Sequence, residues 1–137
     1  MKYSVEKQDE FTIFTMGEEN LNSVKAPNLK SEFLVLAEQG VKNLILNLET
    51  VKFVDSSGLS AILYANRLCS ERDGLCVITG IDHPNVKSLI TISRLDTVLD
   101  IQSNTSDAVK YIMMHTLKSE LESENTTFTD EDDEEGK

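Results

Sequence analysis

The sequence predicts an α/β protein with a mixed, largely parallel sheet of about five strands and four helices. Along the chain, the spacing of apolar residues alternates between two, which is typical of strands, and 3.6, which is typical of helices. Two short segments are apolar at nearly every position, as central strands covered on both faces are: NLILNL and LCVIT. Strands that alternate with helices in this way form a parallel sheet with right-handed crossovers.

The first predicted elements are an antiparallel pair of strands and a helix. YSVEKQ and FTIFTM alternate between apolar and polar residues, and a short polar turn around Gln8 to Glu10 joins them. The helix has Pro27 in its first turn and Gly40 at its end. Its apolar stripe consists of Leu29, Phe33, Leu36 and Ala37.

The middle of the chain supplies two buried strands and the helix between them. NLILNL is predicted to lie in the centre of the sheet, and the polar corner Asp55-Ser56-Ser57-Gly58 follows soon after it. The second helix ends near Gly74, a good C-terminal stop. Its stripe consists of Leu59, Ile62, Leu63 and Cys69. LCVIT is then the next strand.

Three further elements are predicted before the tail. A short helix extends from about Pro84 to Thr91, with His83 at its start, and a brief strand covers Val98 to Ile101. The last helix begins at a polar cap near Ser103 to Ser106. Its inner face consists of Ala108, Val109, Ile112 and Met113.

The acidic charge is concentrated at the C-terminus. The chain carries a net charge of −11, of which residues 118–137, with nine acids and two lysines, contribute −7. This segment has one aromatic residue and little else to bury, so it cannot offset its ordering entropy. We therefore predict one domain over residues 1–117 and a disordered acidic tail over residues 118–137.

The composition also excludes several classes of partner. An acidic chain without a basic stripe argues against nucleic acid and anionic membranes, which require clustered Lys and Arg. No apolar run approaches the roughly 20 residues that a membrane span needs, so we expect a soluble cytoplasmic protein. Cys69 and Cys76 have no Cys or His at zinc-site spacing, and no calcium loop is visible, so no metal is predicted.

The corner at Asp55 has several possible chemical interpretations. The simplest is a helix cap, in which a serine accepts a hydrogen bond from an exposed backbone N–H. A serine nucleophile would need a leading glycine and a partner base, and only His83 and His115 are present. Phosphate-binding glycine loops are absent. An Asp-Ser pair before a helix also occurs in acyl carrier proteins, but that fold is wholly helical and accommodates NLILNL and LCVIT poorly. No cofactor is predicted.

Taken together, the segments resemble a known family. NLILNLETVKFVD followed by SSGLSAIL, a strand LCVITG, a helix PNVKSLITISRL and VLDIQSNTSDAV are similar in order and spacing to the STAS domain of bacterial anti-sigma-factor antagonists. The likeness covers about residues 3–117, and its most specific element is Asp55-Ser56-Ser57-Gly58-Leu59. It departs from the family after Gly17, where EENLNSVKAP stands in place of the usual aspartate-bearing loop.

The resemblance implies a regulatory function without catalysis. Such a domain binds a GHKL-type serine kinase that is also an anti-sigma factor, which frees the sigma factor for transcription. Phosphorylation of the serine directly after Asp55, here Ser56 with Ser57 as the alternative, ends binding, and a phosphatase of the PP2C type reverses it. The implied partner-binding residues are Asp55, Ser56, Ser57, Gly58, Leu59 and Ser60. The alternative is a STAS subunit or scaffold of another complex, such as a lipid-transporting ABC system.

A phosphate at this position is physically suited to act as a switch. At a helix start, exposed N–H groups and the helix dipole favour a negative group by roughly 0.3 to 2 kcal/mol. Against a partner carboxylate roughly 6 Å away, at an effective dielectric constant near 40, a phosphate charge of about −2 costs about 3 kcal/mol, or about a hundredfold in affinity. The fold should therefore tolerate phosphorylation, whereas a docked partner should not.

Overall fold

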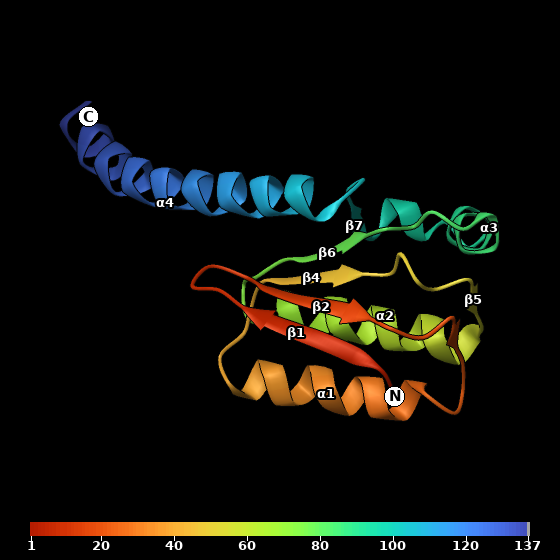
Figure 1. The fold of residues 1–137 in the computed structure, drawn as a ribbon. Helices are drawn as coiled ribbons and strands as arrows, with labels where there is room; N and C mark the ends of the chain where they lie inside the picture. Colours follow the sequence, from red (N-terminus) through yellow and green to blue (C-terminus); the bar gives the residue numbers. More distant parts are fainter. Residues whose placement is uncertain (137) are drawn as a thin grey trace.

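A five-stranded sheet forms the centre of the computed structural model, which describes the backbone of residues 1–136 and the side chains of residues 1–122 (Figure 1). Its strands lie in the order β1-β2-β4-β6-β7. β1 is antiparallel to β2, and the other neighbours are parallel. Their bounds are Tyr3–Lys7 for β1, Thr12–Met16 for β2, Leu44–Asn47 for β4, Cys76–Thr79 for β6 and Asp100–Ile101 for β7. The predicted fold class is confirmed.

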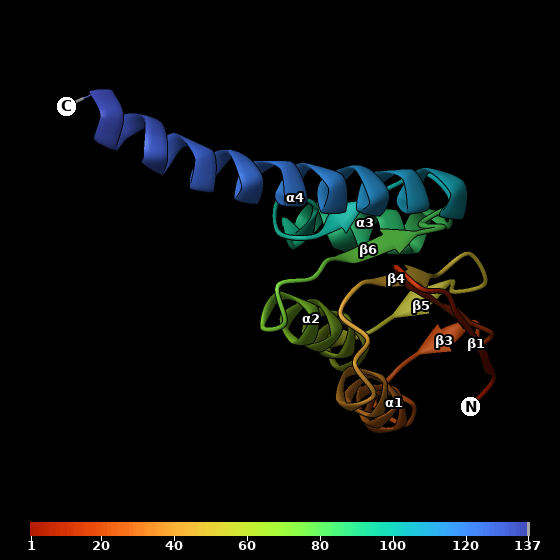
Figure 2. The ribbon, with the colours of Figure 1, turned by 90° about the vertical axis from the view of Figure 1, so that its left-hand side faces the viewer.

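Helices cover both faces of this sheet. They are α1 (Ala26–Glu38), α2 (Ser56–Ser70), α3 (Pro84–Ile92) and α4 (Thr105–Gly136). α1 and α2 pack side by side against one face, and α4 crosses the opposite face (Figures 1 and 2). Each starts within a residue or two of the position that the sequence predicts.

The central strand β4 shows why NLILNL has three apolar residues in succession, Leu44, Ile45 and Leu46. Leu44 and Leu46 belong to the main core beneath α1 and α2, whereas Ile45 belongs to a smaller cluster with Val77 of β6 and Ile112 of α4. Because successive side chains of a strand point to opposite faces, a strand covered on both faces needs apolar residues at every position.

Two short strands and a 3₁₀ turn were not predicted. β3 (Asn20–Leu21) and β5 (Phe53–Val54) form a separate parallel pair, and the 3₁₀ turn covers Leu95–Thr97. The predicted strand from Val98 is correspondingly shorter. A two-residue strand is too short to show a periodic pattern, so only its pairing partner reveals it.

The last helix is longer than expected. Its backbone continues to Gly136, through the segment for which the sequence predicted disorder. Glutamate and lysine are good helix formers, and Lys118 pairs with Glu122 one turn later at 3.8 Å, which favours extending a helix that packing has already started. The last fully buried side chain described is that of Ile112. The division of the chain after residue 117 therefore stays a proposal.

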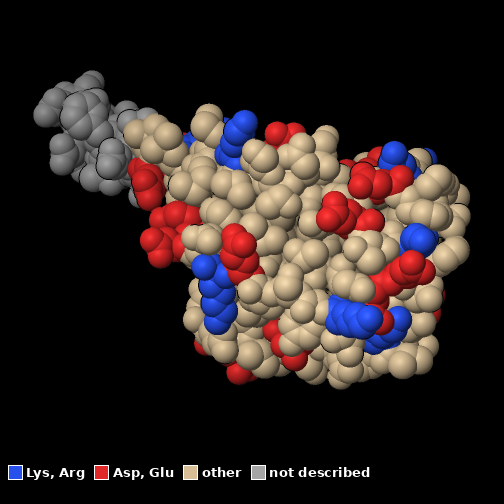
Figure 3. Space-filling view, viewed as in Figure 1, with Lys and Arg blue, Asp and Glu red and all other residues tan. Residues whose placement is uncertain are grey.

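Among the described residues, no helix is both long and apolar enough to traverse a lipid bilayer. On the face drawn in Figure 3, lysines and arginines lie in small groups beside acids and form no continuous basic surface.

Candidate functional site

The candidate site is the first turn of α2, which Asp55 caps. The Asp55 side chain accepts a hydrogen bond through Oδ1 from the backbone N–H of Gly58 at 2.9 Å. Asp55 has extended backbone angles, and its carbonyl accepts the first helical hydrogen bond, from Leu59. This is the standard geometry of an N-cap, but the capping side chain is that of Asp55, whereas the sequence predicted a serine.

The same carboxylate also joins α2 to the loop before α1. Its second oxygen, Oδ2, accepts a hydrogen bond from the backbone N–H of Ser23 at 3.2 Å. The backbone N–H of Asp55 in turn donates to the carbonyl of Leu21 at 3.2 Å. Asp55 therefore fixes two segments that lie 32 residues apart in the sequence into one surface.

Gly58 allows this approach because it has no side chain. A β-carbon at this position would stand 2.2 Å from the carbonyl oxygen of Leu21 and 2.8 Å from its Cγ. Gly58 is buried, and the first turn of α2 rests directly on β3. The glycine of the corner is therefore a packing requirement, and it brings the two serines before it against the α1 loop.

The two serines differ in accessibility. Ser56 is exposed, whereas Ser57 is half-buried. Both line an open depression of about 400 Å³ between the starts of α1 and α2. The other lining residues are Ser23, Ala26, Pro27, Lys30 and Ser60. Lys30 is the only cationic residue among them.

An ion pair stabilises the loop that leads into α1. Lys25 Nζ lies 2.8 Å from Glu18 Oε1, and the backbone N–H of Lys2 donates to Glu18 Oε2 at 3.0 Å. The hydrogen bond from Lys25, with that from Lys2, lowers the pKa of the Glu18 carboxyl. Glu18 and Lys25 both belong to EENLNSVKAP, the segment that departs from the family pattern.

The family is decided by comparison of the sequence with protein-family models. The model of the STAS domain matches residues 2–108. The chain belongs to the STAS domain family. The predicted resemblance is therefore confirmed.

Solved structures of other STAS proteins share the fold. An anti-sigma-factor antagonist domain protein from Planctomyces limnophilus is 18% identical, with a TM-score of 0.72 over 81% of this chain and 97% of its own. The Bacillus cell-fate determinant SpoIIAA in its phosphorylated form is 18% identical, with a TM-score of 0.63 over 81% and 99%. A sulfate transporter family protein from Wolinella succinogenes is 17% identical, with a TM-score of 0.67 over 78% and 88%. Our chain thus has the fold of anti-sigma-factor antagonists.

Within this STAS domain, the predicted partner-binding residues are not equally accessible. Asp55, Ser56 and Ser60 are exposed, so a docking protein can reach their side chains. Gly58 is buried, and Leu59 is half-buried against the main core. The exposed part of this STAS corner is therefore formed by its polar residues Asp55, Ser56 and Ser60.

The structure adds residues that the sequence did not single out. Ser23 and Lys30 come from the segment before α1 and from α1 itself, and they face the depression beside Ser56. In the sequence, the departure from the STAS pattern after Gly17 pointed to this loop. It did not indicate which side chains would line the depression. Ser23 is held beside the corner by the hydrogen bond from its backbone N–H to Asp55.

The histidines and cysteines lie outside the STAS corner. His83 begins α3, as predicted, and its Nδ1 accepts a hydrogen bond from the backbone N–H of Asn85 at 3.2 Å. Cys69 and Cys76 are buried free thiols, and the hydrogen bond to Cys69 together with burial raises the pKa of the Cys76 thiol. A search of the described side chains found no group of three or more His, Cys, Asp or Glu able to hold a metal ion.

Proposed function

We propose that this STAS protein is an anti-sigma-factor antagonist that phosphorylation at Ser56 switches off. In its unphosphorylated form it binds a GHKL-type serine kinase that is also an anti-sigma factor, and so frees a sigma factor. A phosphatase of the PP2C type restores the active form. The protein acts in the cytoplasm, needs no cofactor or metal, and catalyses no reaction itself.

One observation carries this proposal: the Ser56 side chain is exposed in the first turn of α2, directly after the capping residue Asp55. A kinase must bring its active site to a hydroxyl that protrudes from the fold. Ser56 meets this requirement, whereas the half-buried Ser57 is less accessible. The open depression beside Ser56 leaves space for a partner that approaches over α1 and α2.

The local geometry also supports tolerance of a phosphate. The Asp55 side chain accepts from the N–H of Gly58, while the first N–H groups of a helix, here those of Ser56 and Ser57, have no intrahelical acceptor. A phosphate on Ser56 would lie at the positive end of the helix dipole, near these donors. Modification would therefore change the partner surface and leave the domain folded.

The test uses Ser56→Ala and Ser56→Asp with the candidate kinase. Ser56→Ala should bind like the wild type but accept no phosphate in intact mass spectrometry. Ser56→Asp carries a single charge, so its binding in calorimetry should be weaker by roughly tenfold or more. Ser57→Ala is the matched control and should still be phosphorylated. Equal binding by wild type, Ser56→Ala and Ser56→Asp would refute the switch.

A second function remains a candidate because a sulfate transporter family protein shares the fold. In this alternative, the chain is a STAS subunit or scaffold of another complex, such as a lipid-transporting ABC system. It would then co-purify with an ATPase subunit and carry no phosphoserine. Intact mass measurement of protein from its own host, before and after phosphatase treatment, separates the two functions.

A further inference from the structure

The margin of the central sheet that β1 forms is open. β1 is the first strand in the sheet order, and within the described chain it pairs with β2 alone. Every residue of Tyr3–Lys7 is exposed, and Figure 2 shows β1 at the margin of the sheet with no other described element beyond it. An edge strand with free backbone groups is a template on which another strand can pair.

The register of β1 with β2 determines which backbone groups face outward. The carbonyl of Lys2 accepts a hydrogen bond from the N–H of Gly17 at 2.8 Å, and the register then continues without a bulge to Lys7. Hydrogen-bonded and non-hydrogen-bonded pairs alternate along an antiparallel ladder. The even-numbered residues of β1 therefore bond to β2, whereas the N–H and C=O groups of Tyr3, Val5 and Lys7 point away from it.

The side chains along this edge divide between the two faces of the sheet. Val5 lies opposite Phe14 of the main core, and the Tyr3 ring stacks on that of Phe14 with centroids 4.9 Å apart. Tyr3 and Val5 are therefore on the side of α1 and α2, and each remains 38% exposed. Lys2 and Glu6 are exposed on the other side of the strand. The edge thus has apolar surface on one face and one charge of each sign on the other.

The charges of this edge are complementary to those of a second copy of the chain. Two β1 strands can pair antiparallel through their outward groups only in registers that set odd-numbered residues opposite one another. When Ser4 lies on the two-fold axis, Lys2 of each copy stands opposite Glu6 of the other. Tyr3 then exchanges hydrogen bonds with Val5 of the second copy, and their exposed side chains cover each other. Centring the pair on Val5 would set Glu6 opposite Ser4, and centring it on Glu6 would oppose two carboxylates.

We propose that β1 is the interface of a homodimer, in which the strands of two copies pair antiparallel about Ser4 and the two sheets become one. The net charge of −11 opposes association, but most of it lies in residues 118–137. Salt at about 0.15 M screens charges more than about 8 Å apart, and it weakens the adjacent contacts between Lys2 and Glu6 less. One strand from each copy makes a small interface, so the dimer should be weak. The proposal does not rest on phosphorylation at Ser56.

Sedimentation equilibrium of the full chain, over a range of about 10 μM to about 1 mM protein, measures the association. We expect a reversible equilibrium between monomer and dimer with a Kd of about 100 μM or below. A chain that stays monomeric throughout this range would overturn the proposal and leave the edge to a strand of a different protein.

Two charge reversals make the test specific to this register. Lys2→Glu opposes carboxylates in the dimer and Glu6→Lys opposes ammonium groups, so each variant alone should dimerise at least about tenfold more weakly. An equimolar mixture of the two should associate within about threefold of the wild type, because each supplies the charge that the other lacks. Lys87→Glu, an exposed reversal on α3, is the matched control and should dimerise like the wild type. A mixture that associates no better than either variant alone would refute this pairing.

Val5→Pro tests the backbone pairing itself. Proline removes an outward N–H that β2 does not use, and edge strands tolerate proline. The variant should keep its circular dichroism spectrum and remain monomeric, whereas Val5→Thr, which keeps the N–H, should dimerise within about threefold of the wild type. A folded Val5→Pro that dimerises like the wild type would exclude pairing through β1. Should the proline variant fail to fold, the mixture of charge reversals decides.

Discussion

The carbonyl oxygen of Leu21 occupies the space that a side chain on Gly58 would need, because a β-carbon there would come within 2.2 Å of it. Through this contact the first turn of α2 rests on β3, which brings the two corner serines beside the loop that leads into α1. The shape of the candidate site therefore depends on one absent side chain.

Gly58→Ala should be strongly destabilising. The obstructing atom belongs to the backbone, so α2 or β3 must shift, and we expect a loss of about 3 kcal/mol in the free energy of unfolding. Urea denaturation followed by circular dichroism measures this loss. Ser60→Ala, in the same turn but exposed, should change stability by no more than about 0.5 kcal/mol. Equal stability of Gly58→Ala and wild type would show that the close contact is relaxed in solution.

Asp55→Ala should cost about 1 to 2 kcal/mol, because it removes the cap on Gly58 and the bond from Ser23 together. Asp55→Asn keeps an oxygen that can accept from one of the two N–H groups, and asparagine is an equally good N-cap, so its loss should be smaller. Thermal unfolding of both variants measures the difference. A loss as large for Asn as for Ala would indicate that the negative charge, not the hydrogen bonding, stabilises the corner.

The Glu18 ion pair predicts part of the pH dependence of stability. Because Lys25 and the backbone of Lys2 lower the pKa of Glu18 in the folded state, the unfolded chain binds its proton at higher pH. The stabilisation is therefore fully present above the unfolded pKa of about 4.3 and is lost as the pH falls through the lower folded value. In Glu18→Gln, the free energy of unfolding should therefore fall less than in the wild type between about pH 6 and about pH 3.

Urea denaturation at several pH values measures this effect. Glu19→Gln is the matched control, because its partner is Lys52 at 3.1 Å and the two side chains are 59% and 48% exposed. It should alter the pH profile little. Identical profiles for Glu18→Gln and wild type would contradict the prediction.

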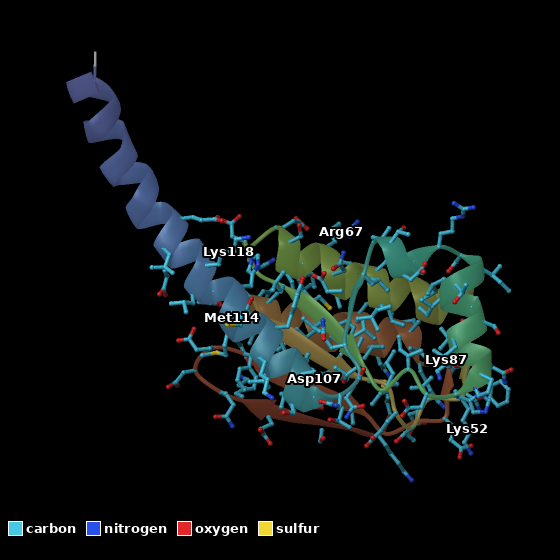
Figure 4. All side chains as sticks on the ribbon, turned by 90° about the horizontal axis from the view of Figure 1, so that it is seen from above. Lys52, Arg67, Lys87, Asp107, Met114 and Lys118 are labelled. Carbon is cyan, nitrogen blue, oxygen red and sulfur yellow. The ribbon has the colours of Figure 1, made fainter. Side chains whose placement is uncertain are left out.

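Removal of residues 118–137 should leave the melting temperature of the domain nearly unchanged. Seen from above in Figure 4, Asp107, Met114 and Lys118 follow one another along α4 toward the part that extends beyond the sheet. After Ile112, the apolar side chains of α4 that are described are exposed: Met113, Met114, Leu117 and Leu121. Differential scanning calorimetry of the shortened chain measures the change.

The positive control for this truncation is Ile112→Ala in the full chain. Ile112 lies on the inner face of α4 and is fully buried against Ile45 and Val77, so its replacement by alanine should cost about 2 to 4 kcal/mol. A large destabilisation from removing residues 118–137 would place the domain boundary further along α4.

The order of the main elements was determined by the sequence alone, because the period of apolar residues records which faces are covered. NLILNL had to be a strand buried on both sides, and the stripe from Leu29 to Ala37 had to be the inner face of a helix. The sequence also determined the turn at Asp-Ser-Ser-Gly, because the capping hydrogen bond joins Asp55 to Gly58, only three residues later.

Only the tertiary structure decided which distant residues meet at each site. The bond between Ser23 and Asp55 and the contact between Leu21 and Gly58 both join segments far apart in the chain. A periodic pattern reports whether a side chain faces the core, but not which segment covers it. That choice depends on the packing of whole helices against the sheet, and it positions the exposed Ser56 beside Ser23 and Lys30.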